Sequence, residues 1–496
     1  MDHSVVIIGS GLGALECGSL LARRGYRVTV LEQHSQPGGC LQSFCRRIPS
    51  DTGPGKHPGG ADAPQSVRFD CGFHYVGGLG EGESFRPLTD LFGLTDLPWI
   101  QLDPDGAEEV YAEGESFLLP SGHEAFADRL ASRFPAERKG ILHFTEVLKG
   151  MGDRMFHAFK PGAGLPDETG RSAHAFLCET IRDPLLRQVL SGTGLRMELR
   201  AETLPLYPFA QISNSFLQSA WRLEGGGKAI VDRLIRILLQ AGGVLRTRAA
   251  ATRLEERPDG SFQVEINGKE ILEADSVIAD IHPAAVLSLL GEHPRIRPVF
   301  RRRISGLENS FGMFTANLLL HPGKLPYLNR SLFIHAPGSD LWHPDGRRTE
   351  SVLVHFYPEG DRIDLLSPMA WPEKAPGGAP GRRNESYETL KNKKLQECLH
   401  LAAQRLPGLE DAIQAAWTST PRTWEDYTGA PGGSAYGIRK DWNNPLGTFL
   451  SVRSPLPHLF FTGQNVGLHG LLGVSMTAVR TCSCLLSDNP LAAGNQ

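Results

Sequence analysis

Residues Ser4–Glu32 read SVVIIGSGLGALECGSLLARRGYRVTVLE, and this stretch predicts the start of a nucleotide-binding fold. Val5–Ile8 is a continuous apolar run, as expected of a parallel strand that is buried on both faces. Gly9, Gly11 and Ala14 follow at once in a G-x-G-x-x-A arrangement. The first glycine permits a tight turn, the second lets backbone approach a pyrophosphate, and the alanine lets a helix pack closely on the strand. The pattern therefore predicts a strand, a phosphate-binding turn and a helix.

The rest of this stretch completes the unit. The helix is expected to end at Gly25, a residue suited to the C′ position, and Arg27–Leu31 is expected to form a second buried strand. Glu32 ends that strand eighteen residues beyond Ala14, close to where an acidic side chain accepts hydrogen bonds from an adenosine ribose. Because strand, turn, helix, strand and acid occur in this order, a nucleotide site is favoured over a glycine turn that binds nothing.

A second strand-turn-helix pattern lies near the C-terminus. Leu459–Thr462 predicts a buried strand, Gly463 a turn, and Gly473–Leu486 a helix whose N-terminus again faces a ligand. A ligand that touches both the first and the last of these turns must be long. The pair of patterns therefore favours a dinucleotide with a large second ring system over a mononucleotide.

Composition is that of an ordinary globular protein. The chain has 496 residues, of which 40% are hydrophobic and 21% charged, and its formal net charge is −4. This charge gives no reason to expect nucleic acid as a partner, and the basic run Arg301–Arg303 is interpreted as a solvated surface. The eight cysteines include no C-x-x-C pair, which favours a reduced, intracellular protein without a bound metal.

The sequence also bears on location. No basic and apolar leader precedes the first strand, and no run of eighteen apolar residues occurs, so we expect a cytoplasmic protein. Peripheral contact with a membrane is left open, and Met151–Leu165 is the candidate segment for it. There Met155, Phe156 and Phe159 lie beside two cations, although such a stripe can equally pack a helical core. Oligomeric state is also left open.

Several blocks together resemble the FAD-dependent phytoene desaturase and carotenoid isomerase superfamily. They are the N-terminal fingerprint, the PGGC loop at 37–40, FDCGFHYVGG at Phe69–Gly78 and TGQNVGLHGLLG at 462–473. FDCGFHYVG, GGSAYGIRKD at Gly432–Asp441 and LFFTGQN resemble the retinol-saturase-like members, the all-trans-retinol 13,14-reductases, most closely. The likeness extends over nearly the whole chain.

The resemblance implies an α/β fold with a Rossmann-type, GR2-like FAD-binding domain and a discontinuous substrate domain of antiparallel sheet plus helices. We expect the FAD-binding domain at 1–80, 215–295 and 430–496, and the substrate domain at 81–214 and 296–429. The apolar runs Phe314–Leu320, Ser351–Phe356 and Arg362–Leu366 are the expected strands of the substrate domain, and its helices are expected within Leu118–Leu204 and at Tyr387–Leu406.

By position, the resemblance implies how FAD is held. Gly9, Gly11, Leu12 and Ala14 would bind the pyrophosphate, Glu32 the adenosine ribose, and Gly39, Cys40 and Leu41 the phosphate-ribityl region. Ala251 would contact adenine, Gly463 and Gln464 the ribityl chain, and Leu472, Gly473 and Val474 the pyrimidine edge of the flavin. One departure is that Gln464 and Asn465 stand where the family often has an acid beside the ribityl hydroxyls.

The expected chemistry follows from the same resemblance. No second strand-linked G-x-G-x-x-G is present, so a dedicated nicotinamide domain is not expected. In the family, flavin acts on a conjugated polyene in an apolar tunnel, and the cofactor carries the difficult step. Few catalytic side chains are therefore expected. His74, Tyr75, Tyr436 and His469 are candidates for the substrate pocket, without an assigned proton-transfer role.

Two other classes of protein use the same scaffold. One is an amine-oxidase-like flavoenzyme, which needs an aromatic cage for a polar amine. The other is a flavin-free lipid-binding protein of the Rab GDP-dissociation-inhibitor type, which the intact Gly9, Gly11, Ala14 and Glu32 argue against. Saturation, desaturation and isomerisation of a carotenoid or retinoid are all left open.

Overall fold

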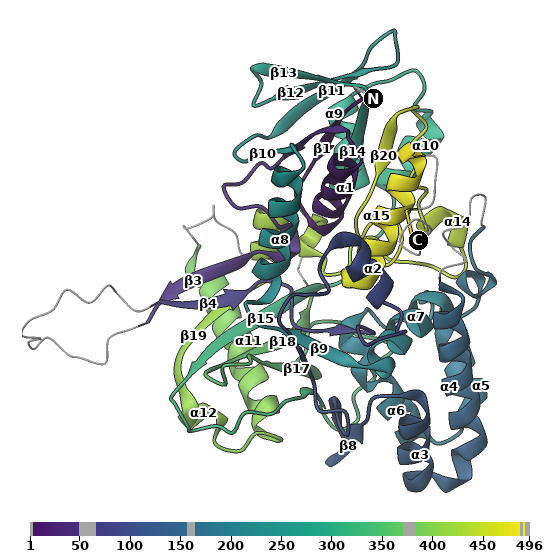
Figure 1. Ribbon diagram of the computed structural model, residues 1–496. Coiled ribbons are helices and arrows are strands. Elements are labelled where there is room, and N and C mark those ends of the chain that lie inside the picture. The colour runs from purple at the N-terminus through teal and green to yellow at the C-terminus, as the bar shows by residue number, and fades with distance from the viewer. Residues whose placement is uncertain (1–2, 49–65, 156–163, 371–382, 487–489, 492–496) are drawn as a thin grey trace, which may run out of the picture.

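The computed structural model describes residues 3–48, 66–155, 164–370, 383–486 and 490–491. Two Gly- and Pro-rich stretches lie wholly or mostly outside these ranges, at 50–65 and 372–383. Figure 1 shows the chain organised around two sheets, with strands contributed by segments that are far apart in the sequence.

The first sheet is five-stranded and entirely parallel. Its strands, in spatial order, are β10 (Val244–Arg246), β2 (Arg27–Leu31), β1 (Ser4–Ile8), β14 (Ser276–Ala279) and β20 (Leu459–Phe461). The two predicted strand-turn-helix units are confirmed, because β1 leads into helix α1 (Leu12–Arg23) and β20 precedes helix α15 (Gly470–Leu486). Both turns lie at the carboxyl edge of the sheet, which is where open α/β sheets bind ligands.

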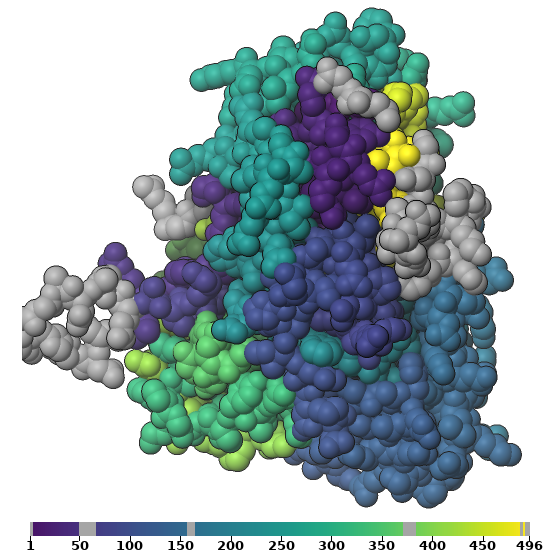
Figure 2. Space-filling model, in the orientation of Figure 1, coloured from purple at the N-terminus to yellow at the C-terminus, as the bar shows by residue number. Residues whose placement is uncertain are grey.

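Helix α1 is buried along almost its whole length because it lies between α8 (Gly226–Gln240) and α15. Figure 1 shows these three helices side by side over the parallel sheet, and in Figure 2 the purple N-terminal segment is flanked by teal and yellow surface. Small residues permit this packing: a Cβ atom on Gly18 would lie 3.2 Å from Val30 of β2. On the opposite face, Val6 and Ile8 pack against Phe262.

That opposite face is covered by a small antiparallel sheet of β11 (Ala251–Glu256), β12 (Phe262–Ile266) and β13 (Glu270–Ala274). The three strands pair in the order in which they follow one another along the chain. Strand β13 leads directly into β14, so the small sheet is a connection within the nucleotide-binding unit.

The second large sheet has seven strands. In spatial order they are β19 (Ile413–Ser419), β15 (Gly312–Leu320), β18 (Arg362–Met369), β17 (Ser351–Phe356), β16 (Ser331–His335), β7 (Glu108–Ala112) and β8 (Glu115–Leu119). All pairs are antiparallel except β16 with β7. Every residue of β15, β16 and β17 is buried, since helix α11 (Glu385–Ala403) packs against the sheet through Cys398, Leu399 and Ala402.

The segment around residues 118–204 is helical, as predicted. It contains α3 (His123–Arg133), α4 (Arg138–Asp153), α5 (Ala173–Thr180) and α6 (Pro184–Gly192), and α7 (Leu206–Gln218) follows. The remaining elements are short strands and helices that join these layers. They are β3 (Ser43–Arg47), β4 (Ser66–Asp70), β5 (Val76–Gly77), β6 (Trp99–Gln101), β9 (Ala220–Leu223), α2 (Arg86–Phe92), α9 (Pro283–Leu290), α10 (Pro298–Ser305), α12 (Leu409–Ala412), α13 (Pro421–Thr428) and α14 (Pro445–Thr448).

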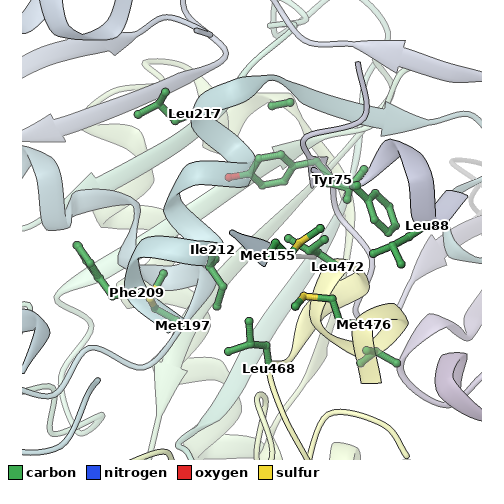
Figure 3. Close-up of a cluster of buried hydrophobic side chains, with 14 of the residues drawn as sticks. Tyr75, Leu88, Met155, Met197, Phe209, Ile212, Leu217, Leu468, Leu472 and Met476 are labelled. Carbon is green, nitrogen blue, oxygen red and sulfur yellow. The ribbon is translucent and has the colours of Figure 1, made fainter. Parts of the chain in front are cut away.

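The structure describes only part of the candidate membrane-contact segment, Met151–Leu165. Met155 is 1% exposed, and Figure 3 shows it among buried side chains that include Leu472 and Met476. Met155 therefore belongs to the hydrophobic core, where an unbranched apolar side chain fills space between its neighbours. Phe156 and Phe159 lie outside the described residues. Within the described ranges, no helix is both long enough and apolar enough to cross a membrane.

Candidate cofactor and substrate site

One cavity of about 670 Å³ extends from the carboxyl edge of the parallel sheet to the seven-stranded sheet. It brings together nearly all of the side chains that the sequence nominated. The nominated residues that line it are Gly9, Gly11, Leu12, Glu32, Gly39, Cys40, Leu41, Ala251, Gly463, Gln464, Leu472, Gly473 and Val474, together with His74, Tyr75, Tyr436 and His469. Ala14 is fully buried behind the lining instead. The roles of these residues toward a cofactor remain predictions.

The turn between β1 and α1 is Gly9–Ser10–Gly11, and its backbone lines the cavity because two of its three residues have no side chain. Gly9 has a φ of +97°, and a Cβ atom there would lie 2.8 Å from the carbonyl oxygen of Asp280. A Cβ atom on Gly11 would lie 2.5 Å from Oδ2 of the same aspartate. Any substitution at either glycine therefore has to displace Asp280 or the turn itself.

Asp280, which the sequence analysis did not nominate, stands at the centre of this end of the cavity. It follows β14 directly, and its Oδ2 accepts the backbone N–H of Ala14 at 3.1 Å. Burial raises the pKa of Asp280 to about 7, the Ala14 N–H opposes the rise, and the Glu32 carboxylate adds to it. Asp280 could have been identified from the sequence because it is the first residue after a buried parallel strand, and that position lies at the ligand-binding edge of the sheet.

Asp280 also alters one sequence-based conclusion. The segment at Gln464 and Asn465 offers no acid, but a Cβ atom on neighbouring Gly463 would lie 2.2 Å from Asp280 Oδ1. The fold thus brings a carboxyl group from another strand beside the C-terminal turn. Asn465 has a structural task, since its Oδ1 accepts the backbone N–H of Ile438 at 3.2 Å.

Glu32 is the residue directly after β2, and it lines the cavity at the carboxyl edge of the parallel sheet. It is 6% exposed and accepts hydrogen bonds from the Ser10 hydroxyl and, at 2.8 Å, from the backbone N–H of His34. The backbone of Glu32 accepts the N–H of Ala249 at 2.8 Å, which holds the strand leading to Ala251 beside it. An acidic side chain and a backbone edge therefore face the same space.

The PGGC loop packs directly on the first glycine turn. The N–H of Gly38 donates to the carbonyl oxygen of Ser10 at 3.0 Å, and Gly38 has a φ of +119°. A Cβ atom on Gly39 would lie 3.1 Å from the Cα of Gly11. These two backbones approach one another closely, so the PGGC loop and the turn between β1 and α1 form two walls of the same end of the cavity. We call this end the cradle.

Lys440, in the GGSAYGIRKD block, fixes the C-terminal glycine loop. Its Nζ donates to the carbonyl oxygens of Thr448 at 3.0 Å, Asn465 at 3.1 Å and Val466 at 3.4 Å. Burial lowers the pKa of Lys440 to about 7. A lysine after a glycine-rich block carries no distinctive sequence signal for this task, which explains why it was missed.

The other half of the cavity is apolar. Its walls come from the helical segment, the seven-stranded sheet and the C-terminal loop, and Figure 3 shows Ile212 of α7 near Leu468 and Leu472. The apolar lining side chains are Phe73, Val76, Leu195, Ile212, Phe216, Met313, Leu353, Leu366, Leu468, Leu471 and Leu472. We call this half the apolar lobe. It is suited to a hydrophobic ligand because few polar groups there need hydration.

Three of the four nominated pocket residues have their polar atoms bound by protein. The Tyr75 hydroxyl donates to Glu108 Oε1 at 2.6 Å, and the Tyr436 hydroxyl donates to the carbonyl oxygen of Leu195. His469 Nε2 donates to the carbonyl oxygen of Arg196 at 3.0 Å, and burial lowers the pKa of His469 to about 4. These three side chains are therefore held in place as wall residues.

Within the described residues, Arg196 is the arginine or lysine that lines the cavity, and its charge is neutralised by a neighbouring carboxylate. Its guanidinium pairs with Glu108 and lies 4.2 Å from the ring centre of Phe216. Both partners of the ion pair have 7% exposed side chains. The wall therefore presents little net charge to a ligand at this point.

Comparison with known proteins first defines the class. Residues 7–91 match the family model of the NAD(P)-binding Rossmann-like domain. The fold is similar to that of putrescine oxidase bound to putrescine, with a TM-score of 0.63 and 16% identity over 98% of this chain and 100% of that one. The comparisons and the fold thus define the class as an α/β protein with a Rossmann-type nucleotide-binding unit.

Two relatives are similar to this chain in sequence over most of its length. The chain is 24% identical to all-trans-retinol 13,14-reductase of Macaca fascicularis, over 98% of this chain and 86% of that protein. It is 22% identical to the neurosporene-forming phytoene desaturase of Cereibacter sphaeroides, over 94% of this chain and 92% of that protein. The resemblance to the phytoene desaturase and carotenoid isomerase superfamily is therefore confirmed along the full chain.

Proposed function

We propose that this protein is an FAD-dependent oxidoreductase that acts on carbon-carbon double bonds of a hydrophobic polyene of the retinoid or carotenoid class. The observation that carries the proposal is a single cavity in which the glycine turns at the carboxyl edge of the parallel sheet open into the apolar lobe. Relatives named for retinol reduction and phytoene desaturation support the substrate class.

The cradle fits a dinucleotide. Gly9, Gly11 and Gly463 can pack closely against Asp280 because they lack the Cβ atom that would collide with it. The N-terminus of α1 beside them is where a Rossmann-type fold binds phosphates. In this proposal Glu32 binds the adenosine ribose and Ala251 the adenine, while Leu472, Gly473 and Val474 border the flavin. FAD, when bound, would supply two-electron chemistry, and the protein would orient the polyene and exclude water from it.

The visible spectrum of the purified protein is the first test. Bound FAD gives a yellow protein with a flavin spectrum, and a colourless protein that does not take up added FAD would contradict the proposal and favour a flavin-free binding protein. The second test is anaerobic incubation with all-trans-retinol and with carotenoids, followed by mass analysis of the product. A gain of two hydrogens indicates saturation, a loss of two indicates desaturation, and an unchanged mass with altered retention indicates isomerisation.

Amines serve as the competing substrates in the same experiment, because the putrescine oxidase fold is similar. Among the described residues, the carboxylates that line the cavity are Glu32 and Asp280, which lie at the glycine-turn end and not in the apolar lobe. A primary ammonium group would therefore lose hydration without gaining a partner. Oxidation of putrescine at a rate above that of every polyene would overturn the proposal.

A further inference from the structure

The wall of the apolar lobe conceals a network of ionisable side chains that no part of the proposed function uses. His74 lines the cavity, and behind it lie His355, Tyr357, Asp364 and Asp70, all of them at most 5% exposed. Buried polar groups cost free energy unless they are satisfied. Their arrangement therefore requires an explanation beyond packing.

Asp364 is the centre of the network. It lies on β18 with no exposed surface, and its Oδ1 accepts a hydrogen bond from Asn317 Nδ2 at 2.6 Å. Its Oδ2 accepts the hydroxyl of Tyr357 at 2.8 Å. Burial raises the pKa of Asp364 to about 7, while the two hydrogen bonds and the Arg362 cation oppose that rise. The carboxyl group can therefore exchange a proton near neutral pH.

Tyr357 connects Asp364 to the second buried carboxyl. Its oxygen accepts the backbone N–H of Asp70 at 2.8 Å while its hydroxyl donates to Asp364. The Asp70 side chain accepts the backbone N–H of Gly227 at 3.2 Å. Tyr357 is therefore fixed from two sides, and Asp364 has donors on both of its oxygens.

His74 is the point at which this network reaches the cavity. Its Nδ1 lies 3.8 Å from Asp364 Oδ2 and is buried with no hydrogen-bond partner among the described residues. Its side chain is 12% exposed, and burial lowers its pKa to about 4, so the ring is neutral near pH 7. When Asp364 is protonated, its carboxyl group is a donor facing an unpartnered acceptor, and the 3.8 Å between them has to shorten for a hydrogen bond to form. The opposite edge of the ring, with Nε2, is left for the cavity.

We propose that His74 exchanges a proton with a substrate carbon through Nε2, and that Asp364 is the positioning residue that supplies or takes up the proton at Nδ1. The inference rests on the proposed function. In the saturating direction, a bound reduced flavin would supply a hydride, with its two electrons, to one carbon of a double bond. The π electrons form the other C–H bond with the Nε2 proton, and Nδ1 takes the proton of Asp364, which becomes a carboxylate held by Asn317 and Tyr357.

Desaturation reverses each of these transfers, so Asp364 must then begin as the carboxylate. The proton is accounted for in both directions, and the histidine remains neutral before and after. The geometry distinguishes His74 from the other wall residues, since Tyr75, Tyr436 and His469 donate their polar hydrogens to protein acceptors. His74 alone among these four has a buried nitrogen without a partner in the described part of the chain.

The charges around the network determine its pH dependence. His74 faces Asp364 of β18 and the ring of His355 of β17, whose centre is 5.2 Å away. The titratable or charged groups that act on Asp364, Asp70 and His355 are Tyr357, Arg362, Arg68, Arg222 and His74. Tyr357 lowers the pKa of Asp364 by hydrogen bonding, so its removal raises that pKa further.

The test compares His74→Gln, Asp364→Asn and Tyr357→Phe with the parent holoenzyme on the polyene that the parent converts. His74→Gln is expected to keep the flavin spectrum and lower turnover by about 10²–10⁴-fold, the usual contribution of general acid–base catalysis. Asp364→Asn is expected to lower turnover and to abolish the limb of the pH profile of turnover near pH 7, which reflects the ionisation of Asp364. Tyr357→Phe is expected to move that limb to higher pH, whichever direction the reaction takes.

His335→Gln is the matched control. His335 is a buried imidazole on neighbouring β16, but it bonds the Gly192 carbonyl at 2.8 Å and the Ser351 hydroxyl at 2.7 Å and does not line the cavity. Turnover and the pH limb are expected to remain those of the parent. In D₂O, the parent is expected to place one solvent deuteron in a saturated product.

Three results would overturn the inference. Parent-like turnover in His74→Gln would show that the histidine takes no part in the reaction. An unshifted pH dependence of turnover in Tyr357→Phe would show that Asp364 takes no part in it. An isomerised product without solvent deuterium removes the proton transfer itself. If the parent converts no polyene at all, the proposed function fails and the inference fails with it, and this outcome is distinguished from the others because it is seen in the unmutated protein.

Discussion

The Oδ2 atom of Asp280 accepts the backbone N–H of Ala14 at 3.1 Å, so a carboxyl group from the end of β14 caps the N-terminus of α1. This is the position at which a Rossmann-type fold holds a negatively charged pyrophosphate. Two anions near one helix N-terminus repel each other. A dinucleotide is therefore expected to bind best when Asp280 is protonated.

The first prediction is a pH dependence of cofactor affinity. The pKa of Asp280 is about 7 in the free protein, and a nearby pyrophosphate raises it further. Binding then takes up a proton once the free carboxyl is ionised, so affinity is expected to fall as pH rises above 7, by at most ~10-fold per pH unit. Asp280→Asn is expected to remove this dependence. Fluorescence titration of the apoprotein with FAD between pH 6 and 9 measures it.

Asp275→Asn provides the matched control at the other end of β14. Asp275 accepts the backbone N–H of Ser4 at 2.7 Å, and this bond is the main reason why its pKa is lowered. It stays ionised throughout the titration and lies away from the carboxyl edge. Its substitution should leave the pH dependence intact, and a parent protein with pH-independent affinity would show that Asp280 does not meet the cofactor.

The second prediction concerns the glycine turn. Gly11→Val is expected to abolish FAD binding, because even the Cβ atom would lie 2.5 Å from Asp280 Oδ2 and the branched chain would fill the phosphate space. Gly170→Ala, at a glycine with open space around it, controls for the loss of a glycine. The measurement is the flavin content of the folded proteins. Stoichiometric FAD in Gly11→Val would show that this turn does not bind the pyrophosphate.

The contrast between Glu32 and Asp280 explains what sequence can predict. Glu32 belongs to a local pattern of strand, turn, helix and strand whose spacing is fixed by geometry, so its position at the cavity could be predicted. Asp280 meets Ala14 across a separation of 266 residues, and His74 meets Asp364 across a similar distance along the chain. Such contacts depend on which strands lie side by side in each sheet, and no local sequence pattern specifies that order.

The seven-stranded sheet illustrates the same limit. The apolar runs of β15, β17 and β18 identified them as strands, since strands buried on both faces read as continuous hydrophobic segments. Strand β7 reads EEVYA and carries two buried glutamates, whose charges are paired with Arg196 and Arg405. Its charged residues suggest a surface segment until those partners are known.

The third prediction tests the adenosine end. Glu32→Ala is expected to weaken FAD binding by ~1.5–3 kcal/mol, the contribution of one charge-assisted hydrogen bond. Part of the loss can be structural, because Glu32 also holds the Ser10 hydroxyl and the His34 N–H. Ser10→Ala removes the first of those bonds without removing the carboxylate, so it separates the two effects. An unchanged dissociation constant in Glu32→Ala would exclude the residue from the site.

The last prediction asks whether the apolar lobe holds the substrate. Leu366 lies on β18, is 5% exposed and lines the cavity two residues beyond Asp364. Leu366→Trp is expected to fill the lobe and cost ~1–3 kcal/mol of substrate binding through overpacking, a factor of about 5–150 in kcat/KM. FAD content is expected to stay stoichiometric, because the cradle lies at the other end of the cavity.

Leu446→Trp is the surface control, since Leu446 is 78% exposed on α14 and the added ring displaces nothing. Its kinetics are expected to match those of the parent. A shorter polyene should lose less in Leu366→Trp than a long one, because the indole shortens the space available along the sheet. If the variant loses FAD while retaining the chain-length preference of the parent, this part of the cavity belongs to the cofactor and the substrate must enter elsewhere.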